Sequence, residues 1–266
     1  MSASAERVSV EVDGHVAVVT LRRADKHNAL DLPMFDAIIT AAERVQEMAS
    51  VRAVVLCGQG ASFCSGLDFV SVAEAGGLEA FTATLDDPSP NYFQRAAYEW
   101  LRLPVPVIAA IHGNCYGGGL QIALAADIRV CAPNAKLSVM EARWGLIPDM
   151  SITRTLPRLV GIDVAKELTY TARVFDGEEA LRLGLVTRLS DDPVGGALEL
   201  AAQIAAHSPD AVRRAKQLFD AGWTGSAQET LALEAQLQKQ LIGTPNQLAA
   251  VTAGLTKQPA RFTDPA

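Results

Sequence analysis

Hydrophobic and polar residues alternate over two short stretches near the start of the chain, 8–12 and 15–21, and Asp13-Gly14 separates them. Alternation with a period of two predicts half-buried strands, and Asp-Gly between two such stretches is typical of a hairpin turn. Compact apolar runs over 53–57, 107–111 and 128–131 predict further strands that are buried on both faces. Strands are therefore expected throughout the first half of the chain.

Helical periodicity first occurs over 32–48, where Asp31 is placed to cap the helix and Pro33 occupies a favourable first-turn position. A second helical pattern covers 92–101. From residue 152 onward only helical patterns remain, over 152–160, 163–170, 177–183, 193–206, 209–221, 228–242 and 245–256. This order predicts an α/β core over 1–195 and a helical C-terminal region over 196–266. Residues 71–91 have a mixed, Gly- and Pro-containing composition that indicates a flexible excursion of the kind that often covers a ligand site.

Composition argues against several classes of function. The 266 residues carry a formal net charge of −7 and no basic cluster longer than a pair, which argues against nucleic acid as a partner. The four cysteines lack C-x-x-C spacing and the four histidines form no pair at ligand spacing, so neither a metal site nor a disulfide framework is expected. Neither a signal peptide nor a membrane-spanning run is visible, so we expect a cytoplasmic protein.

The clearest candidate for chemistry is the glycine run 117–119, which lies between the strand predicted over 107–111 and an apolar helical stretch over 120–126. Glycines at such a turn allow a ligand atom to approach the backbone and leave N–H groups free to bind an electron-rich oxygen. The other interpretation is a tight packing turn. Two positions later stands Gln121, an amide that cannot transfer a proton as an acid or base near neutral pH.

Several sequence blocks occur in an order that is typical of one family. They are Leu21 to Leu30, Gly60 to Asp68 with the motif Phe63-Cys64-Ser65-Gly66-x-Asp68, Pro106 to Asp127, and Glu141 to Gly161. From about Val8 to Phe262 the chain resembles the crotonase superfamily, the enoyl-CoA hydratase/isomerase family. The resemblance implies a crotonase-like α/β spiral of repeated ββα units, a helical C-terminal trimerisation region, and assembly as a homotrimer or a dimer of trimers. It implies an acyl-CoA thioester substrate and no separate cofactor, because CoA is part of the substrate.

The resemblance also implies an oxyanion hole, formed by the backbone N–H groups of Ser65 and Gly118. Two such donors stabilise the negative charge that develops on the thioester oxygen when a neighbouring carbon loses a proton. Other positions are implied to contact the substrate, with Lys26 placed near a CoA phosphate and Trp144 as a wall of the acyl pocket; the remaining ones are Gly66, Leu67, Asp68, Gly117 and Gln121. Asp68 has a second interpretation, as a residue that structures its own loop.

The family's two hydratase glutamates correspond to Gln121 and Glu141 in this chain. One carboxylate is enough for a 1,3-proton shift, so Glu141 is the expected base of an isomerase. Asp149 resembles the second carboxylate of the dienoyl-CoA isomerases, although it is also placed to cap a helix that begins near Ser151. We therefore expect an enoyl- or dienoyl-CoA isomerase using Glu141 and Asp149. The alternatives are an enoyl-CoA hydratase that uses Glu141 and a water held by Gln121, and a non-catalytic acyl-CoA-binding protein.

Overall fold

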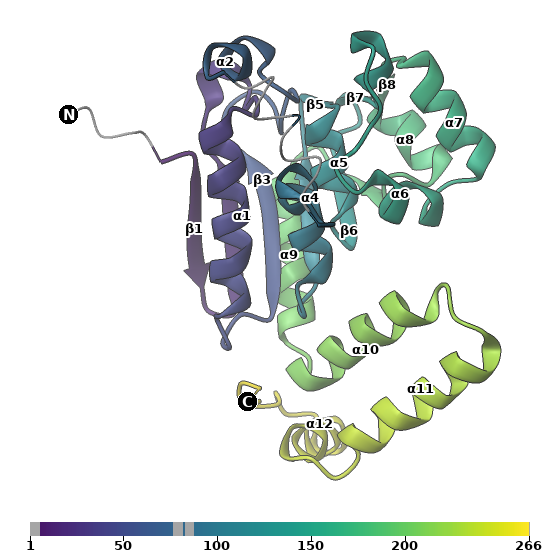
Figure 1. Cartoon of the computed structure of the whole chain (residues 1–266). Helices are drawn as coiled ribbons and strands as arrows, with labels where there is room; N and C mark the ends of the chain where they lie inside the picture. Colours follow the sequence, from purple (N-terminus) through teal and green to yellow (C-terminus); the bar gives the residue numbers. More distant parts are fainter. Residues whose placement is uncertain (1–5, 77–81, 83–87, 266) are drawn as a thin grey trace.

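A computed structural model describes residues 6–76, 82 and 88–265 (Figure 1). Part of the excursion expected over 71–91, namely residues 77–81 and 83–87, lies outside the described residues. The segment that leads into it forms a helix that the sequence pattern did not indicate, α2 (Phe69–Glu74).

The main sheet has six strands in the order β1-β2-β3-β4-β6-β9. Their bounds are β1 (Val8–Asp13), β2 (Val16–Leu21), β3 (Ala53–Gly58), β4 (Val107–Ile111), β6 (Ile128–Cys131) and β9 (Arg188–Leu189). The hairpin expected at Asp13-Gly14 pairs β1 with β2 in antiparallel fashion, and all other neighbours are parallel. The apolar runs thus form strands at the centre of a parallel sheet, where both faces are covered.

Residues of β3 alternate between two apolar layers. Val54 and Leu56 pack into the larger core, which also contains residues of α1 (Leu32–Gln46) and α4 (Tyr92–Arg102). Ala53 and Val55 pack on the opposite face, together with residues of α9 (Pro193–Ala205). Because α9 covers the sheet, the division expected between residues 195 and 196 falls inside a helix of the core.

A smaller sheet carries three short strands in the order β5-β7-β8: β5 (Asn114–Tyr116), β7 (Lys136–Ser138) and β8 (Phe175–Asp176). Helix α5 (Gly118–Leu124) follows β5 directly, and the 3-10 turn η2 (Glu141–Trp144) comes shortly after β7. Since β5 and β7 are paired in parallel, the segments that follow them leave the sheet at the same edge. This small sheet brings the glycine run close to Glu141.

The other helices of the core surround these elements. They are η1 (Ala24–Lys26), α7 (Ile162–Thr171) and α8 (Gly177–Leu183), which match the sequence pattern closely where it made a prediction. The single helix expected over 152–160 is instead divided into α6 (Ile152–Thr155) and η3 (Leu156–Arg158). Pro157 lacks an N–H and disfavours a continuous α-helix through this point.

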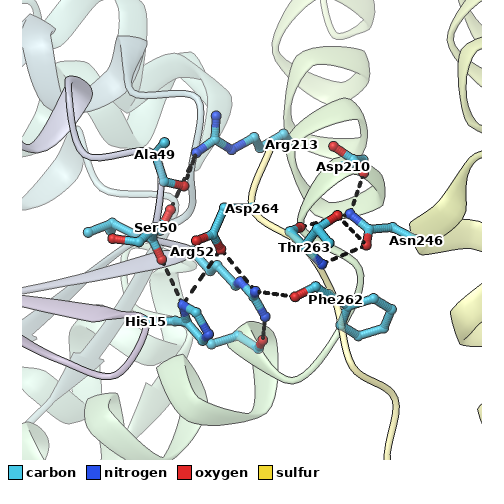
Figure 2. A network of polar contacts seen from close by, with 12 residues as sticks. His15, Ala49, Ser50, Arg52, Asp210, Arg213, Asn246, Phe262, Thr263 and Asp264 are labelled. Carbon is cyan, nitrogen blue, oxygen red and sulfur yellow. Dashed lines mark hydrogen bonds and ion pairs between the residues drawn. The ribbon is translucent and has the colours of Figure 1, made fainter. Parts of the chain in front are cut away.

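Helices α10 (Pro209–Gly222), α11 (Ala227–Leu241) and α12 (Pro245–Thr256) extend away from the sheet (Figure 1). Residues 262–264, which follow α12, connect these helices to the core (Figure 2). Arg52 of the core donates to the Phe262 carbonyl at 3.1 Å and pairs with Asp264 at 3.0 Å. The same segment is bound to α12, because Asn246 donates to the Thr263 carbonyl at 3.0 Å. Among the described helices, none has the length and apolarity needed to cross a membrane.

Candidate active site

A cavity of about 330 Å³ opens where α5, η2 and the loop before α2 meet. Most of the candidate residues line it: Ser65, Gly66, Leu67, Gly117, Gly118, Gln121, Glu141, Trp144 and Asp149. The cavity also has an apolar wall that the sequence pattern did not assign to a site, including Leu30, Phe35, Phe93, Met140 and Met150. These residues are ordinary core apolar positions in the sequence, and only their convergence in space marks them as pocket residues.

The glycine run is required by its surroundings. Gly117 has φ 50° and ψ −122°, a backbone conformation that favours glycine. A Cβ atom on Gly118 would lie 2.8 Å from the Met150 sulfur, and a Cβ atom on Gly119 would lie 2.5 Å from the Cys64 carbonyl oxygen. Gly118 is the first residue of α5, where an N–H group has no partner within the helix. Because Gly118 lines the cavity, its N–H is available to a bound oxygen.

The structure corrects the second donor of the expected oxyanion hole. The backbone N–H of Ser65 donates to the His27 carbonyl at 3.0 Å, so it is already bonded. One residue later, the Gly66 carbonyl accepts from the Leu30 N–H at 2.8 Å, and the Asp68 N–H donates to the Leu30 carbonyl at 3.0 Å. In an extended segment successive N–H groups point to opposite sides, so the N–H of Leu67 points away from Leu30. Leu67 lines the cavity, which makes it the better second donor.

Gln121 and Glu141 form the polar centre of the cavity. Gln121 lies on α5 and is 2% exposed, and its Nε2 donates to Glu141 Oε1 at 2.6 Å. The Gln121 Oε1 accepts from the backbone N–H of Met150 at 2.8 Å. The other carboxylate oxygen, Glu141 Oε2, is buried and has no hydrogen-bond partner within the described residues. The amide therefore fixes one oxygen of the carboxylate and leaves the other for chemistry.

Burial raises the pKa of the Glu141 carboxyl above its ordinary value, and the charge of Asp149 raises it further, against the hydrogen bond from Gln121. Burial also raises the pKa of Asp149. Both carboxyls line the cavity, and each is moved toward the range in which a carboxyl can both accept and release a proton near neutral pH.

Asp149 does not cap a helix. Helix α6 begins at Ile152, and its N-cap residue is Ser151, which makes no side-chain capping hydrogen bond. The Ser151 hydroxyl instead donates to the Gln94 carbonyl at 3.3 Å. The interpretation of Asp149 as an N-cap, which the sequence left open, is therefore wrong, and its carboxyl lies in the wall of the cavity.

Asp68 and Lys26 lie outside the set of cavity-lining residues. Asp68 caps α2 by accepting from the Ser71 N–H at 3.1 Å, and it pairs with Arg23 at 2.8 Å. Burial opposes its ionisation, but the hydrogen bonds from Ser71 and the Arg23 guanidinium outweigh burial and lower the pKa of Asp68 to about 2. Asp68 thus structures its loop. Lys26 is exposed, and its carbonyl accepts from the Ser65 hydroxyl at 3.4 Å.

Two aromatic residues flank the cavity entrance. Phe69 and Trp144 lie with ring centroids 4.8 Å apart, and 56% of Trp144 is exposed. Their position agrees with a role as walls for an apolar chain. Within the described residues, no group of three His, Cys, Asp or Glu side chains is placed to hold a metal ion.

Comparisons with known proteins agree with this geometry. The family model described as enoyl-CoA hydratase/isomerase matches residues 11–265. Mouse mitochondrial methylglutaconyl-CoA hydratase is 32% identical over 254 residues, with 93% of this chain and 79% of that protein covered. Mouse mitochondrial delta(3,5)-delta(2,4)-dienoyl-CoA isomerase is 31% identical over 257 residues, with 92% and 77% covered.

The fold has solved counterparts as well. The crystal structure of an enoyl-CoA hydratase from Bacillus anthracis superposes with a TM-score of 0.89 at 32% identity, covering 96% of this chain and 98% of that one. The resemblance carried by the Gly60 to Asp68 block and the glycine run is thereby confirmed, together with the crotonase-like α/β fold. The chain belongs to the enoyl-CoA hydratase/isomerase family and is an enzyme of that family.

Proposed function

We propose that the protein is an isomerase that moves a double bond in an enoyl- or dienoyl-CoA thioester. The observation that carries this proposal is the pair of carboxyls, Glu141 and Asp149, that line one cavity, where an amide, Gln121, and not a third carboxyl is hydrogen-bonded to Glu141. The absence of a capping bond from Asp149 supports the proposal, because it leaves that carboxyl for proton transfer.

The reaction follows from the positions of these groups. Glu141 Oε2 takes a proton from a carbon beside the double bond, and the C–H electron pair moves into the conjugated system to form an enolate. The negative charge on the thioester oxygen is stabilised by the N–H groups of Gly118 and Leu67; losing one such donor costs about 2.7–4 kcal/mol in related sites. Asp149 in its protonated form returns a proton to the far carbon. The double bond has moved, and exchange with solvent resets both carboxyls.

Hydration of a 2-enoyl-CoA is the second candidate. One observation favours it. The Gln121 amide nitrogen carries two N–H groups, and one of them donates to Glu141. The second N–H is available to hold a water beside that carboxylate. The similarity to a methylglutaconyl-CoA hydratase points in the same direction. Against it, water addition in this site has to rely on Glu141 as base without a second glutamate at position 121.

The discriminating experiment incubates the purified protein with 2-enoyl-, 3-enoyl- and 3,5-dienoyl-CoA esters and measures product mass and ultraviolet absorbance. Isomerisation leaves the mass unchanged and alters the absorbance, whereas hydration adds the mass of one water. We expect turnover of the 3-enoyl or 3,5-dienoyl ester without mass change. Fast hydration of the 2-enoyl ester would overturn the isomerase proposal. Tight binding of all three esters without turnover would identify a non-catalytic acyl-CoA-binding protein.

We also propose that the C-terminal helices mediate assembly into a homotrimer or a dimer of trimers. Large apolar side chains on these helices are exposed in the single chain, including Phe219, Leu231 and Leu255, and so is Trp223 at the C-cap of α10. Apolar surface of this kind is typical of an interface between subunits. Sedimentation velocity at several protein concentrations measures the assembly directly.

A further inference from the structure

A second cavity lies behind the wall that carries Asp149. Its volume is about 450 Å³, and it is open to solvent and lined by residues 89–90, the start of α4, the loop 147–149 and helix α6. It shares Ile147 and Asp149 with the active-site cavity, so these two residues form a common wall. The two cavities therefore adjoin at Ile147 and Asp149.

The lining of this second cavity is rich in hydrogen-bond donors. Gln94 and Tyr98 lie one turn apart on α4 and are half-buried, while Thr153 and Arg154 come from α6. The Gln94 Oε1 accepts from the Asn91 N–H at 3.0 Å, which leaves the Nε2 group of that amide as a donor. The guanidinium of Arg154 has no hydrogen bond or ion pair with any part of the chain that the structure describes. The cavity is therefore complementary to an acceptor that carries negative charge.

The charge balance of the cavity points to a carboxylate. Arg154 is the only cationic residue of its lining and Asp149 is the only acidic one, within the described residues. A planar guanidinium binds a carboxylate through two parallel hydrogen bonds, which makes it selective for that group. Because like charges repel, a ligand carboxylate is expected to lie against Arg154 and away from Asp149.

We propose that the second cavity binds a carboxylate at the far end of the acyl chain, so that the preferred substrates are CoA monothioesters of unsaturated dicarboxylic acids. In this arrangement Ile147 contacts the methylene chain and Arg154 determines specificity for the charged end, assisted by the donors of Gln94 and Tyr98. The inference rests on the proposed function only in taking an acyl-CoA as the ligand. It concerns which acyl chain is bound and does not depend on whether the enzyme isomerises or hydrates.

The test measures binding of saturated acyl-CoA esters, which undergo neither reaction. Isothermal titration compares adipoyl-CoA with hexanoyl-CoA and suberoyl-CoA with octanoyl-CoA, pairs that match in chain length and differ in the terminal group. We expect the carboxyl-ended member of at least one pair to bind about tenfold more tightly. Arg154→Gln should remove that preference and change the affinity for the methyl-ended ester less than about twofold, while Arg154→Lys should retain part of the preference.

The matched control is Arg182→Gln, which removes an exposed arginine of α8 that does not line this cavity and should leave both affinities unchanged. Because the Arg154 side chain is exposed and unbonded, its replacement should not alter the melting temperature, which is measured alongside. Equal affinities within every pair, or a preference that survives Arg154→Gln, would overturn the inference while leaving the proposed function intact. If neither member of any pair binds, both proposals fail.

Discussion

Gln121 connects Glu141 to the backbone of Met150, with a 2.6 Å hydrogen bond to the carboxylate and a 2.8 Å hydrogen bond from the backbone N–H. A buried amide thus joins the expected base to the segment that carries Asp149. An amide offers both a donor and an acceptor, so Gln121 can donate to the Glu141 carboxylate and accept from the Met150 N–H at once. An ionised carboxylate in the same place has no donor for Glu141. This relationship makes residue 121 a positioning residue of the site.

Replacing Gln121 by Glu should therefore disturb the titration of the base. The variant places a second carboxyl within hydrogen-bond distance of Glu141 Oε1, and two interacting carboxyls titrate as a pair with one raised pKa. We expect the rising limb of the pH–rate profile to move to higher pH. The control Gln121→Met removes both hydrogen bonds without adding charge and should lower the rate across the pH range without that upward shift. An unchanged profile for Gln121→Glu would contradict the positioning role.

Replacing Glu141 by Gln should strongly reduce turnover under either enzymatic proposal. General acid–base groups contribute about 10²–10⁴-fold to rate, so we expect a loss of this size in kcat with substrate binding retained. Asp149→Asn should reduce isomerisation and leave any hydration unaffected. Steady-state kinetics with a 3-enoyl and a 2-enoyl ester measure both effects. Equal loss of both activities in Asp149→Asn would show that Asp149 has no role specific to proton return.

The raised pKa of Glu141 also has a consequence for stability. As pH rises, this carboxyl ionises in the unfolded chain before it ionises in the folded protein, so the folded state retains a proton that the unfolded state has released. Its contribution to stability is thus fully present below the unfolded pKa and declines as pH rises through the folded pKa. We expect Glu141→Gln to melt at a higher temperature than the wild type at neutral pH, with a difference that shrinks in acid. Scanning calorimetry from pH 4 to pH 8 measures this; a constant difference would contradict it.

Adjacent glycines should respond differently to alanine. In Gly119→Ala the new Cβ atom meets the Cys64 carbonyl at 2.5 Å, a backbone atom that cannot move easily, so we expect a loss of about 1–3 kcal/mol in the free energy of unfolding. In Gly118→Ala the Cβ atom meets the ends of two side chains, Met150 and Leu30, which can shift more easily than backbone. That variant should keep most of its stability and lose kcat/KM, because the methyl group projects beside the N–H donor. Urea unfolding and kinetics on both variants test the contrast.

Much of the fold could be predicted from hydrophobic periodicity. The central strands and long helices have unbroken apolar patterns, and their predicted bounds agree with the structure within two residues for β3, α4 and α11. The short strands β5, β7 and β8 could not be found this way, because two or three residues carry no detectable period. These strands position Glu141, so its proximity to Gln121 depends on pairing between distant segments and could be inferred only through the family resemblance.

The oxyanion donor shows a different limit. Ser65 and Leu67 both belong to the same characteristic block, and composition does not distinguish them. Which backbone N–H is free depends on whether His27 or Leu30 lies beside the segment, a tertiary relationship that no local pattern encodes. Sequence therefore identified the block that holds the donor, and the hydrogen-bond partners identified the residue.

The ion pair between Arg52 and Asp264 has a consequence for synthesis of the protein. Its two residues are separated by 212 positions, so the sheet and its covering helices are made long before the partner of Arg52 leaves the ribosome. Synthesis proceeds from the N-terminus, so Arg52 lacks these partners until residues 262–264 have been made. Its burial against that segment therefore follows the synthesis of all six strands of the main sheet.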